Sequence, residues 1–222
     1  MSSNKGHVLV SGGSGGIGSA LCRLLPDSGY RPVVGYHSNA AQAVALAGEC
    51  GGVAVRIDLT DDASISQALG ELPPDICGVV LAASPPPELV TFTRLQPAGL
   101  LHQLQVNVLG PQRLLAGLIR DHFRKRKSGI VVGVLSETTG RPPDPPSVGM
   151  PSYVIAKSAL RSILDVCAAE YPWLKVRTVS PGFTRTKMLD VFDERYLALV
   201  SATTPIAAPA DVARTILSEI VR

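Results

Sequence analysis

The chain has 222 residues, 45% hydrophobic and 18% charged, a composition that favours one globular domain over a disordered chain. Lysine and arginine exceed aspartate and glutamate by 21 − 18 = 3, too small an excess to indicate nucleic acid as a partner. Because the chain shows no membrane-length apolar run, a poor signal-peptide pattern at its start and four scattered cysteines without metal-ligand spacing, we expect a cytoplasmic protein that binds neither membrane nor metal.

Short runs rich in Val, Ile and Leu alternate with helical patterns along the chain. Strands are expected at residues 7–11, 31–36, 52–58, 76–82, 130–135 and 175–180. Helices are expected at residues 17–25, 40–49, 63–72, 98–123, 151–170 and 210–221. This alternation predicts an α/β fold, a doubly wound parallel sheet (Rossmann fold) of about six strands with helices on both faces, in one domain over residues 1–222. Ligands on such sheets bind beyond the carboxyl ends of the strands.

The first expected strand runs directly into a glycine-rich turn. Five of the seven residues from Gly12 to Gly18 are glycine. Glycine permits positive φ and lets the backbone approach a pyrophosphate closely, and the N-terminus of the next helix favours the phosphate charge. A strand, a glycine turn and a helix in this order predict a dinucleotide site.

The end of the second strand bears on which dinucleotide binds. An Asp or Glu there would hold the 2′-hydroxyl of NAD, but residues 33–39 contain no acid. His37, Ser38 and the following helix N-terminus would accept a 2′-phosphate, which favours NADP(H) without excluding NAD(H). The alternative is that His37 and Ser38 only cap the second helix. Asp58 is placed to meet the adenine amino group or, alternatively, to cap the next helix.

Tyr153 and Lys157 lie four residues apart and therefore on one helical face. A tyrosine with its ordinary pKa near 10 is a poor acid–base catalyst at neutral pH. A neighbouring ammonium would stabilise the tyrosinate and lower that pKa. Tyr153 would then protonate a carbonyl oxygen as hydride arrives, or take a hydroxyl proton in the reverse reaction.

These motifs resemble the short-chain dehydrogenase/reductase family over about residues 7–221. The chain has that family's Thr-Gly-x-x-x-Gly-x-Gly loop with Ser11 in the Thr position, an Asp after the third strand, an Asn-Ser-Tyr-Lys set, and Pro181-Gly182 after the sixth strand. Several motifs in the same order make the resemblance specific.

The resemblance implies a catalytic set of Asn107, Ser136, Tyr153 and Lys157. Tyr153 would be the general acid/base, Lys157 would bind the nicotinamide ribose and lower the Tyr pKa, and Ser136 would polarise the substrate carbonyl. Asn107 would hold a water that links Lys157 to solvent. Alternatively, Ser136 is a strand-end hydroxyl and Asn107 a buried helix-kink residue before Gly110-Pro111.

The implied cofactor-binding residues extend from the glycine turn to the segment after the sixth strand. They are Ser11, Gly12, Ser14, Gly15, Gly16, Ile17, Gly18, Tyr36, His37, Ser38, Asp58, Leu59, Ala82, Ala83, Ser84, Asn107, Tyr153, Lys157, Pro181, Gly182, Thr184 and Thr186.

The chain departs from the family pattern at three places. Ala82-Ala83-Ser84, followed by three prolines, replaces the Asn-Asn-Ala-Gly that usually follows the fourth strand. The loop over residues 138–152 is longer than usual, contains Pro142-Pro143-Asp144-Pro145-Pro146, and should overhang the site, so that Thr138 or Thr139 could take the place of Ser136. The family's final strand has no counterpart, which favours a homodimer through the long helix and the Tyr-Lys helix over the family's common tetramer.

Residues 183–204 resemble the family's mobile lid over an apolar pocket, with Met188, Leu189, Phe192, Tyr196 and Leu197; alternatively, they only pack on the core. Within the family, the pattern is nearest to 3-oxoacyl-[acyl-carrier-protein] reductases and polyketide ketoreductases. The expected function is therefore NADPH-dependent reduction of a ketone, a 3-oxoacyl or polyketide thioester on a carrier protein, with Tyr153 as general acid.

The basic run of residues 124–127, with Arg120 one turn earlier, could receive an acyl carrier protein, although cations near a helix C-terminus more simply complement its dipole. The alternative functions are oxidoreduction of a free sugar, steroid, aldehyde or secondary alcohol, or cofactor sensing without turnover.

Overall fold

The computed structural model describes residues 5–140 and 143–222, and within them the chain forms one parallel sheet with the strand order β3-β2-β1-β4-β5-β6. The strands are β1 His7–Ser11, β2 Arg31–Tyr36, β3 Val53–Arg56, β4 Ile76–Leu81, β5 Gly129–Val134 and β6 Leu174–Val179. The order reverses beside β1, between β1 and β4, as in a doubly wound fold. The predicted fold class is confirmed.

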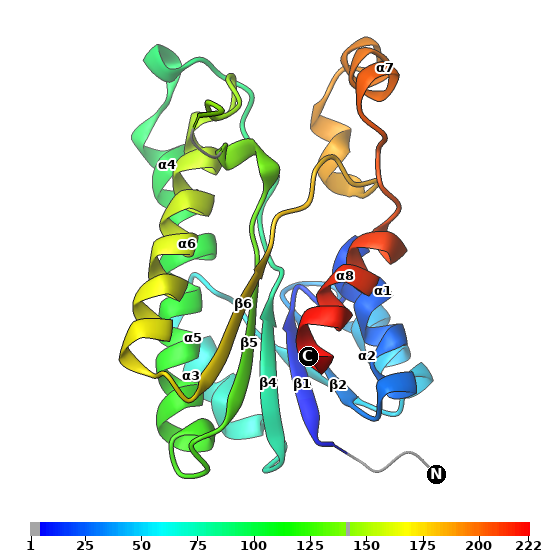
Figure 1. Ribbon diagram of the computed structural model, residues 1–222, viewed down its shortest axis with the longest axis vertical. Helices are drawn as coiled ribbons and strands as arrows, with labels where there is room; N and C mark the ends of the chain where they lie inside the picture. The colour runs from blue at the N-terminus through cyan, green and yellow to red at the C-terminus, as the bar shows by residue number, and fades with distance from the viewer. Residues whose placement is uncertain (1–4, 141–142) are drawn as a thin grey trace.

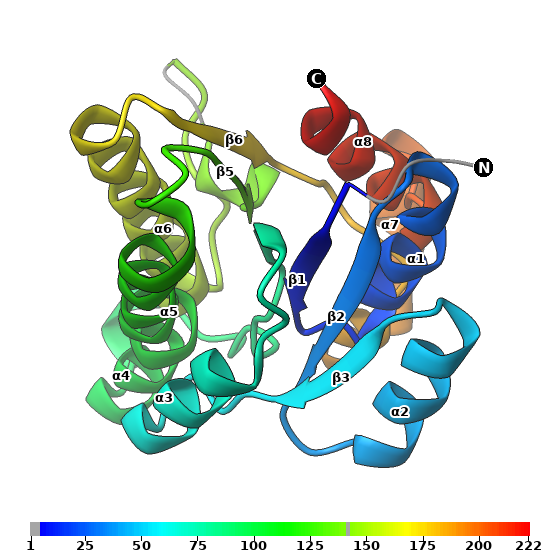
Figure 2. The same cartoon turned by 90° about the horizontal axis from the view of Figure 1, so that it is seen from below.

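Helices cover both faces of the sheet (Figures 1 and 2). One face carries α1 Gly16–Leu24, α2 Ala40–Glu49 and α8 Pro209–Val221, and the other carries α3 Asp62–Glu71, α4 Pro97–Leu104, α5 Gly110–Leu118 and α6 Pro151–Glu170. A further helix, α7 Glu194–Thr203, stands apart from the sheet. No described helix is long and apolar enough to cross a membrane.

The core consists of two apolar clusters, one on each side of the sheet. Residues of β1 alternate between them, since Leu9 packs with the α3–α5–α6 side while Val8 and Val10 pack with the α1–α2–α8 side. All five residues of β1 are buried, as expected for a central strand of a parallel sheet. The continuous apolar runs in the sequence therefore report burial on two faces.

The long helix expected over 98–123 is interrupted by two π-helical turns, η3 Gln105–Leu109 and η4 Ile119–Phe123. Pro111 has no N–H to donate to the carbonyl of Asn107 four residues earlier, so the regular α-helical pattern cannot continue there. Gly110 is needed beside it, because a side chain at this position would collide with the Leu59 carbonyl. The helix therefore continues past residue 107 with its pattern changed locally.

Other boundaries differ by a few residues. The third strand is shorter than expected and ends at Arg56, after which the chain turns into the Asp58–Asp61 segment that precedes α3. The helix α7 was not predicted, and none of its residues is buried. The start of the chain before Lys5, and Arg141 and Pro142 in the proline-rich loop, lie outside the described residues.

Candidate active site

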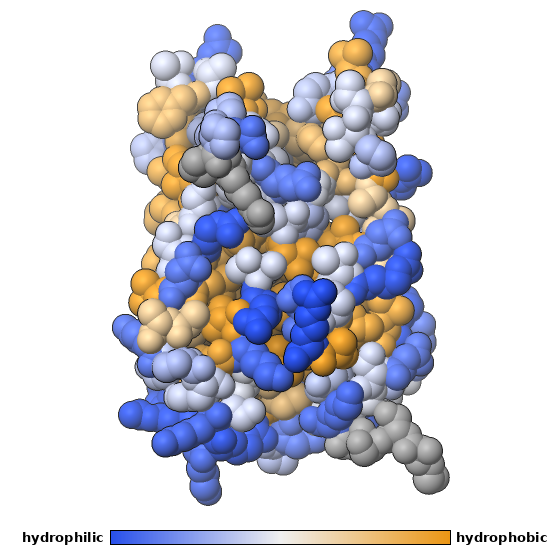
Figure 3. Space-filling model, viewed as in Figure 1, coloured by the Kyte–Doolittle hydropathy of each residue, from blue (hydrophilic) through white to orange (hydrophobic). Residues whose placement is uncertain are grey.

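A cleft of about 650 Å³ opens at the carboxyl ends of the central strands. In Figures 1 and 3 it faces the top of the molecule, which ends there in two lobes with a hollow between them. One lobe carries the loops above α4 and α6, and the other carries the segment around α7. The glycine turn and the Tyr153–Lys157 helix line the same cleft, although they are about 140 residues apart in the sequence.

The glycine turn fits a dinucleotide pyrophosphate. Gly12 has a φ of +68°, and a Cβ there would lie 2.9 Å from the Ala83 Cα. A Cβ on Gly16 would collide with Thr186, so the segment after β6 packs directly on the start of α1. The N-cap residue Gly15 offers no side-chain cap, which leaves first-turn N–H groups to bind an anion.

Ser11 connects the glycine turn to the segment after β4. Its hydroxyl oxygen accepts hydrogen bonds from the backbone N–H groups of Ala82 at 3.1 Å and Ala83 at 3.3 Å. These bonds hold the Ala82–Ser84 segment against the end of β1. Ser11 therefore acts on a cofactor through the backbone that it positions, since its own side chain is buried behind the cleft lining.

His37 and Asp58 meet beyond the carboxyl ends of β2 and β3. His37 Nε2 lies 3.2 Å from Asp58 Oδ2, and the exposed imidazole is free to contact a ligand. Thr60 donates two hydrogen bonds to Asp58 Oδ1, and together with His37 it lowers the pKa of Asp58. The sequence predicted a 2′-phosphate at His37 and an adenine at Asp58. It did not predict that the two side chains pair with each other. The cap of α2 is Asn39, whose side chain accepts from Gln42 N.

Tyr153 and Lys157 are both buried on the first two turns of α6. Lys157 Nζ lies 5.7 Å from the centre of the Tyr153 ring and donates to the Val134 carbonyl at 3.0 Å. Burial lowers the pKa of Lys157 to about 7. Burial also raises the pKa of Tyr153, and the Ser136 hydroxyl partly offsets this rise.

The expectation that Lys157 lowers the tyrosine pKa therefore needs correction for this structure. Desolvation disfavours the charged form of each side chain, and this is the largest cause of both shifts. At neutral pH the protein therefore favours a protonated, neutral Tyr153, and Lys157 lies close to the midpoint between its charged and neutral forms.

Ser136 follows β5 and lies buried in the cleft with Tyr153. Its hydroxyl oxygen accepts from the backbone N–H of Thr138 at 3.3 Å and from the Thr138 hydroxyl at 2.9 Å. Thr138 also lines the cleft, whereas Thr139 does not and instead donates to the Ser136 carbonyl. Ser136 keeps its place at the cleft, and neither threonine replaces it.

Asn107 is fully buried in the π turn and lies behind the cleft lining. Its Nδ2 donates to the Gln103 Oε1 at 2.9 Å and to the Gln103 carbonyl at 3.2 Å. Gln103 Nε2 in turn donates to the Pro86 carbonyl at 2.9 Å. The π turn is thereby tied to the proline-rich segment that lines the cleft. Among the described residues, Asn107 Oδ1 and Ser152 Oγ find no hydrogen-bond partner.

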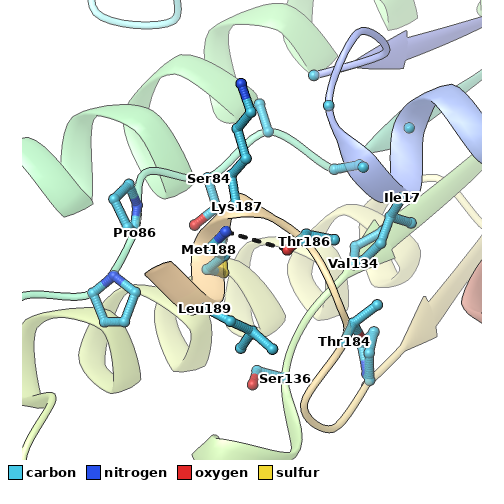
Figure 4. A pocket seen from close by; sticks show the side chains of 18 of the residues that line it. Ile17, Ser84, Pro86, Val134, Ser136, Thr184, Thr186, Lys187, Met188 and Leu189 are labelled. Carbon is cyan, nitrogen blue, oxygen red and sulfur yellow. Dashed lines mark hydrogen bonds between the residues drawn. The ribbon is translucent and has the colours of Figure 1, made fainter. Parts of the chain in front are cut away.

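The expected lid is a discrete segment whose two ends meet at a bridge between Thr184 and Ala207. It brings the apolar side chains of Met188, Leu189 and Phe192 into the cleft. Figure 4 shows Met188 and Leu189 beside Thr186, whose hydroxyl oxygen caps the turn by accepting from Met188 N. The Tyr153 hydroxyl donates weakly to the Met188 sulfur at 3.9 Å. This segment therefore covers Tyr153.

Aromatic packing holds the outer part of the lid together. Tyr196 stacks on Phe192 with ring centres 5.5 Å apart, and both rings contact the edge of Phe183. Tyr196 and Leu197 do not reach the cleft, so the predicted apolar lining is confined to the first part of the segment.

The cleft collects most of the predicted cofactor residues. Its lining contains Gly12, Ser14, Gly15, Gly16, Ile17, Gly18, Ala82, Ala83, Ser84, Pro181, Gly182, Thr184 and Thr186. Tyr36, His37, Ser38 and Asp58 lie outside it, at the β2–β3 end. Leu59 is a core residue against Gly110, so its side chain cannot face a cofactor.

Sequence reasoning missed Gln103 and several lining residues, among them Gln42, Met150 and Lys187. Gln103 precedes Asn107 by four residues, so the two share a helical face, and this spacing is the signal that would have found it. Met150 is the N-cap residue of α6 and Lys187 begins the short 3-10 helix over Lys187–Val191, and neither position shares a helical face with a predicted site residue that would have revealed it.

The basic run does not rim the cleft. Residues 124–127 precede β5, whereas Ser136 follows it, and a six-residue strand separates the two ends by about 20 Å. Arg126 donates instead to the Ile76 carbonyl at the amino edge of the sheet. The hypothesis that this run receives a carrier protein for the site is not supported by its position, and the dipole explanation is the simpler one.

A doubly wound sheet with a glycine turn and a buried Tyr-Lys pair in the cleft at the carboxyl ends of its strands is typical of a class of dinucleotide-dependent oxidoreductases. Comparison with known proteins identifies the family. The family model described as short chain dehydrogenase matches residues 6–196. The 3-oxoacyl-[acyl-carrier-protein] reductase of Mus musculus is 28% identical over 81% of this chain and 75% of its own length. The L-fucose dehydrogenase of Mus musculus is 31% identical over 79% of this chain and 64% of its own length.

A solved short chain dehydrogenase/reductase family protein superposes with a TM-score of 0.84 at 27% identity, over 98% of this chain and 90% of the other. The chain therefore belongs to the short-chain dehydrogenase/reductase family. It is an NAD(P)-dependent oxidoreductase that acts on alcohol and carbonyl groups, and it is similar to 3-oxoacyl-[acyl-carrier-protein] reductases.

Proposed function

We propose that the protein is an NADPH-dependent carbonyl reductase whose substrate is a 3-oxoacyl or polyketide thioester carried by an acyl carrier protein. The observation that carries this proposal is the convergence of Tyr153, Lys157 and Ser136 with the glycine turn in one cleft. The similarity to 3-oxoacyl-[acyl-carrier-protein] reductases supports the substrate class. The apolar side chains of Met188, Leu189 and Phe192 suit an acyl chain.

NADPH, when bound, supplies the hydride that reduces the carbonyl carbon. The first turn of α1 and the glycine turn would hold its pyrophosphate, Pro181, Gly182, Thr184 and Thr186 would frame its nicotinamide, and His37 with Ser38 would hold its 2′-phosphate. Tyr153 donates its phenolic proton to the carbonyl oxygen, and Ser136 donates a hydrogen bond to the same oxygen. Lys157, with a pKa of about 7, returns a proton to Tyr153 at neutral pH. Asn107 would hold a water that links Lys157 to solvent.

The similarity to L-fucose dehydrogenase favours a second candidate, oxidation of a free sugar alcohol. Nicotinamide absorbance with NADPH and NADH, each against 3-oxoacyl thioesters, simple ketones and free sugars, separates the two. The proposal expects NADPH consumption with the thioester to exceed that with any other pair. Faster turnover of a free sugar with NAD⁺ overturns the substrate assignment and supports the second candidate.

The active form is proposed to be a homodimer in the cytoplasm. A cavity of about 410 Å³ between α5 and α6, lined by Leu115, Ile163 and Val166, supports pairing of these two helices with a second copy. The four cysteines are free, which supports a reducing compartment.

A further inference from the structure

The Ser136 hydroxyl has both of its acceptor positions filled by a single residue. Thr138 donates to Ser136 Oγ through its backbone N–H at 3.3 Å and through its own hydroxyl at 2.9 Å. A hydroxyl oxygen has two lone pairs and one proton. With both lone pairs engaged, Ser136 is left to act as a hydrogen-bond donor.

That donor faces the cleft. Ser136 and Thr138 both line it together with Tyr153, and Leu189 and Thr184, which are labelled with Ser136 in Figure 4, line the same pocket. The Ser136 hydroxyl also stabilises the charged form of Tyr153, as a donor to the phenolic oxygen would. A carbonyl oxygen brought to Tyr153 gains negative charge as it is reduced, and a donor already aimed there stabilises that charge.

We propose that Thr138 is a positioning residue that fixes the Ser136 hydroxyl as a hydrogen-bond donor to the substrate carbonyl oxygen. The inference rests on the proposed function, because it assigns Thr138 a part in polarising the carbonyl that Tyr153 protonates. Thr138 itself acts through Ser136. Its hydroxyl removes the alternative in which Ser136 accepts a bond from the substrate or from Tyr153.

The main chain holds this turn independently of the Thr138 hydroxyl. Glu137 N donates to the Pro181 carbonyl at 3.0 Å, Gly140 N to the Glu137 carbonyl at 3.0 Å, and Ser147 N to the Thr138 carbonyl at 2.9 Å. The Thr138 N–H supplies the cap at Ser136. The Thr138 hydroxyl is therefore not needed for the turn, and its removal should leave Ser136 in place.

The test compares Thr138→Val, which keeps the shape and removes the donor, with Thr138→Ser, which keeps the donor. Thr139→Val is the matched control, since the Thr139 hydroxyl bonds only to the Ser136 main-chain carbonyl. Rates of NADPH oxidation with a 3-oxoacyl thioester give kcat and KM, and fluorescence gives the Kd for NADPH. Thr138→Val should lower kcat about tenfold, equivalent to about 1.4 kcal/mol, with KM and Kd nearly unchanged. Thr138→Ser should restore kcat, and Thr139→Val should match the wild type.

A double-mutant cycle separates positioning from general disturbance. In a Ser136→Ala background, Thr138→Val should have almost no further effect on kcat, because the hydroxyl that it positions is gone. A normal kcat in Thr138→Val, failure of Thr138→Ser to restore it, or an undiminished effect in the Ser136→Ala background overturns the inference while the proposed function stands. Absence of carbonyl turnover by the wild type overturns the proposed function, and the inference with it.

Discussion

Lys157 Nζ lies 5.7 Å from the centre of the Tyr153 ring while donating its hydrogen bond to the Val134 carbonyl. Both side chains are buried, so each is driven toward its neutral form. At neutral pH Tyr153 therefore keeps the proton that carbonyl reduction consumes. Lys157, with its pKa at about 7, exchanges protons readily at the same pH.

The buried lysine should make the stability of the wild type depend on pH. Its pKa is about 7 in the folded protein against an ordinary value of 10.5, so between these values the unfolded chain binds one proton more. The free energy of unfolding should therefore rise with pH above about 7, by up to about 1.4 kcal/mol per pH unit. Below pH 7 both states are protonated, and this contribution is constant.

Urea unfolding of the wild type and of Lys157→Met between pH 6 and 8.5 measures this slope. The variant should lose the rise above about pH 7 that the wild type shows. Equal slopes in the two proteins contradict a lowered pKa of Lys157 in the folded protein.

Replacing Gln103 should lower the free energy of unfolding and weaken NADPH binding more than replacing an exposed glutamine on a helix. Gln103→Leu removes the bonds from Gln103 to the Pro86 carbonyl and from Asn107 Nδ2 to Gln103 Oε1, and leaves Asn107 Nδ2 with only its longer bond to the Gln103 main-chain carbonyl. The expected loss is about 1–3 kcal/mol of unfolding free energy, with a raised KM for NADPH because the segment after β4 is loosened. Gln67→Leu, on the exposed face of α3, is the matched control and should change neither quantity. An unchanged KM together with unchanged stability refutes this role for Gln103.

The proposed dimer face can be tested with one buried charge. Val166 on α6 is 56% exposed in the single chain and lines the cavity between α5 and α6, so Val166→Glu should place a carboxylate in the interface and shift the protein to monomer. Val44 on α2 is similarly exposed, at 60%, and Val44→Glu should leave the assembly unchanged. Light scattering gives the mass. A tetrameric wild type contradicts the proposed dimer, and a Val166→Glu variant that stays dimeric counts against the proposed interface.

Strand and helix order could be predicted from the sequence because burial on two faces leaves continuous apolar runs, as in β1 and β4. The π turn at Asn107 was not predictable in detail, since Gly110-Pro111 indicates a break in the helix but not the form that the break takes. The helix α7 lies in the segment that the sequence indicated only as a lid, and none of its residues is buried.

The candidate site was predictable at positions where the backbone conformation or the proton transfer requires a particular residue type. Gly12 needs its positive φ, and Tyr153 with Lys157 needs helical spacing. The tie between Gln103 and Pro86 and the bonds from Thr138 to Ser136 depend on how loops fold back on the sheet. The position of the basic run at the opposite edge also required the fold, because distance along the sequence does not show which end of a strand a segment occupies.

Tyr153→Phe tests the central claim most directly, because it removes one hydroxyl and keeps the ring beside Lys157. NADPH oxidation with a 3-oxoacyl thioester should fall by about 10²–10⁴-fold, while the Kd for NADPH measured by fluorescence stays within error of the wild type. Persistence of wild-type turnover in Tyr153→Phe would contradict Tyr153 as the proton donor and with it the mechanism.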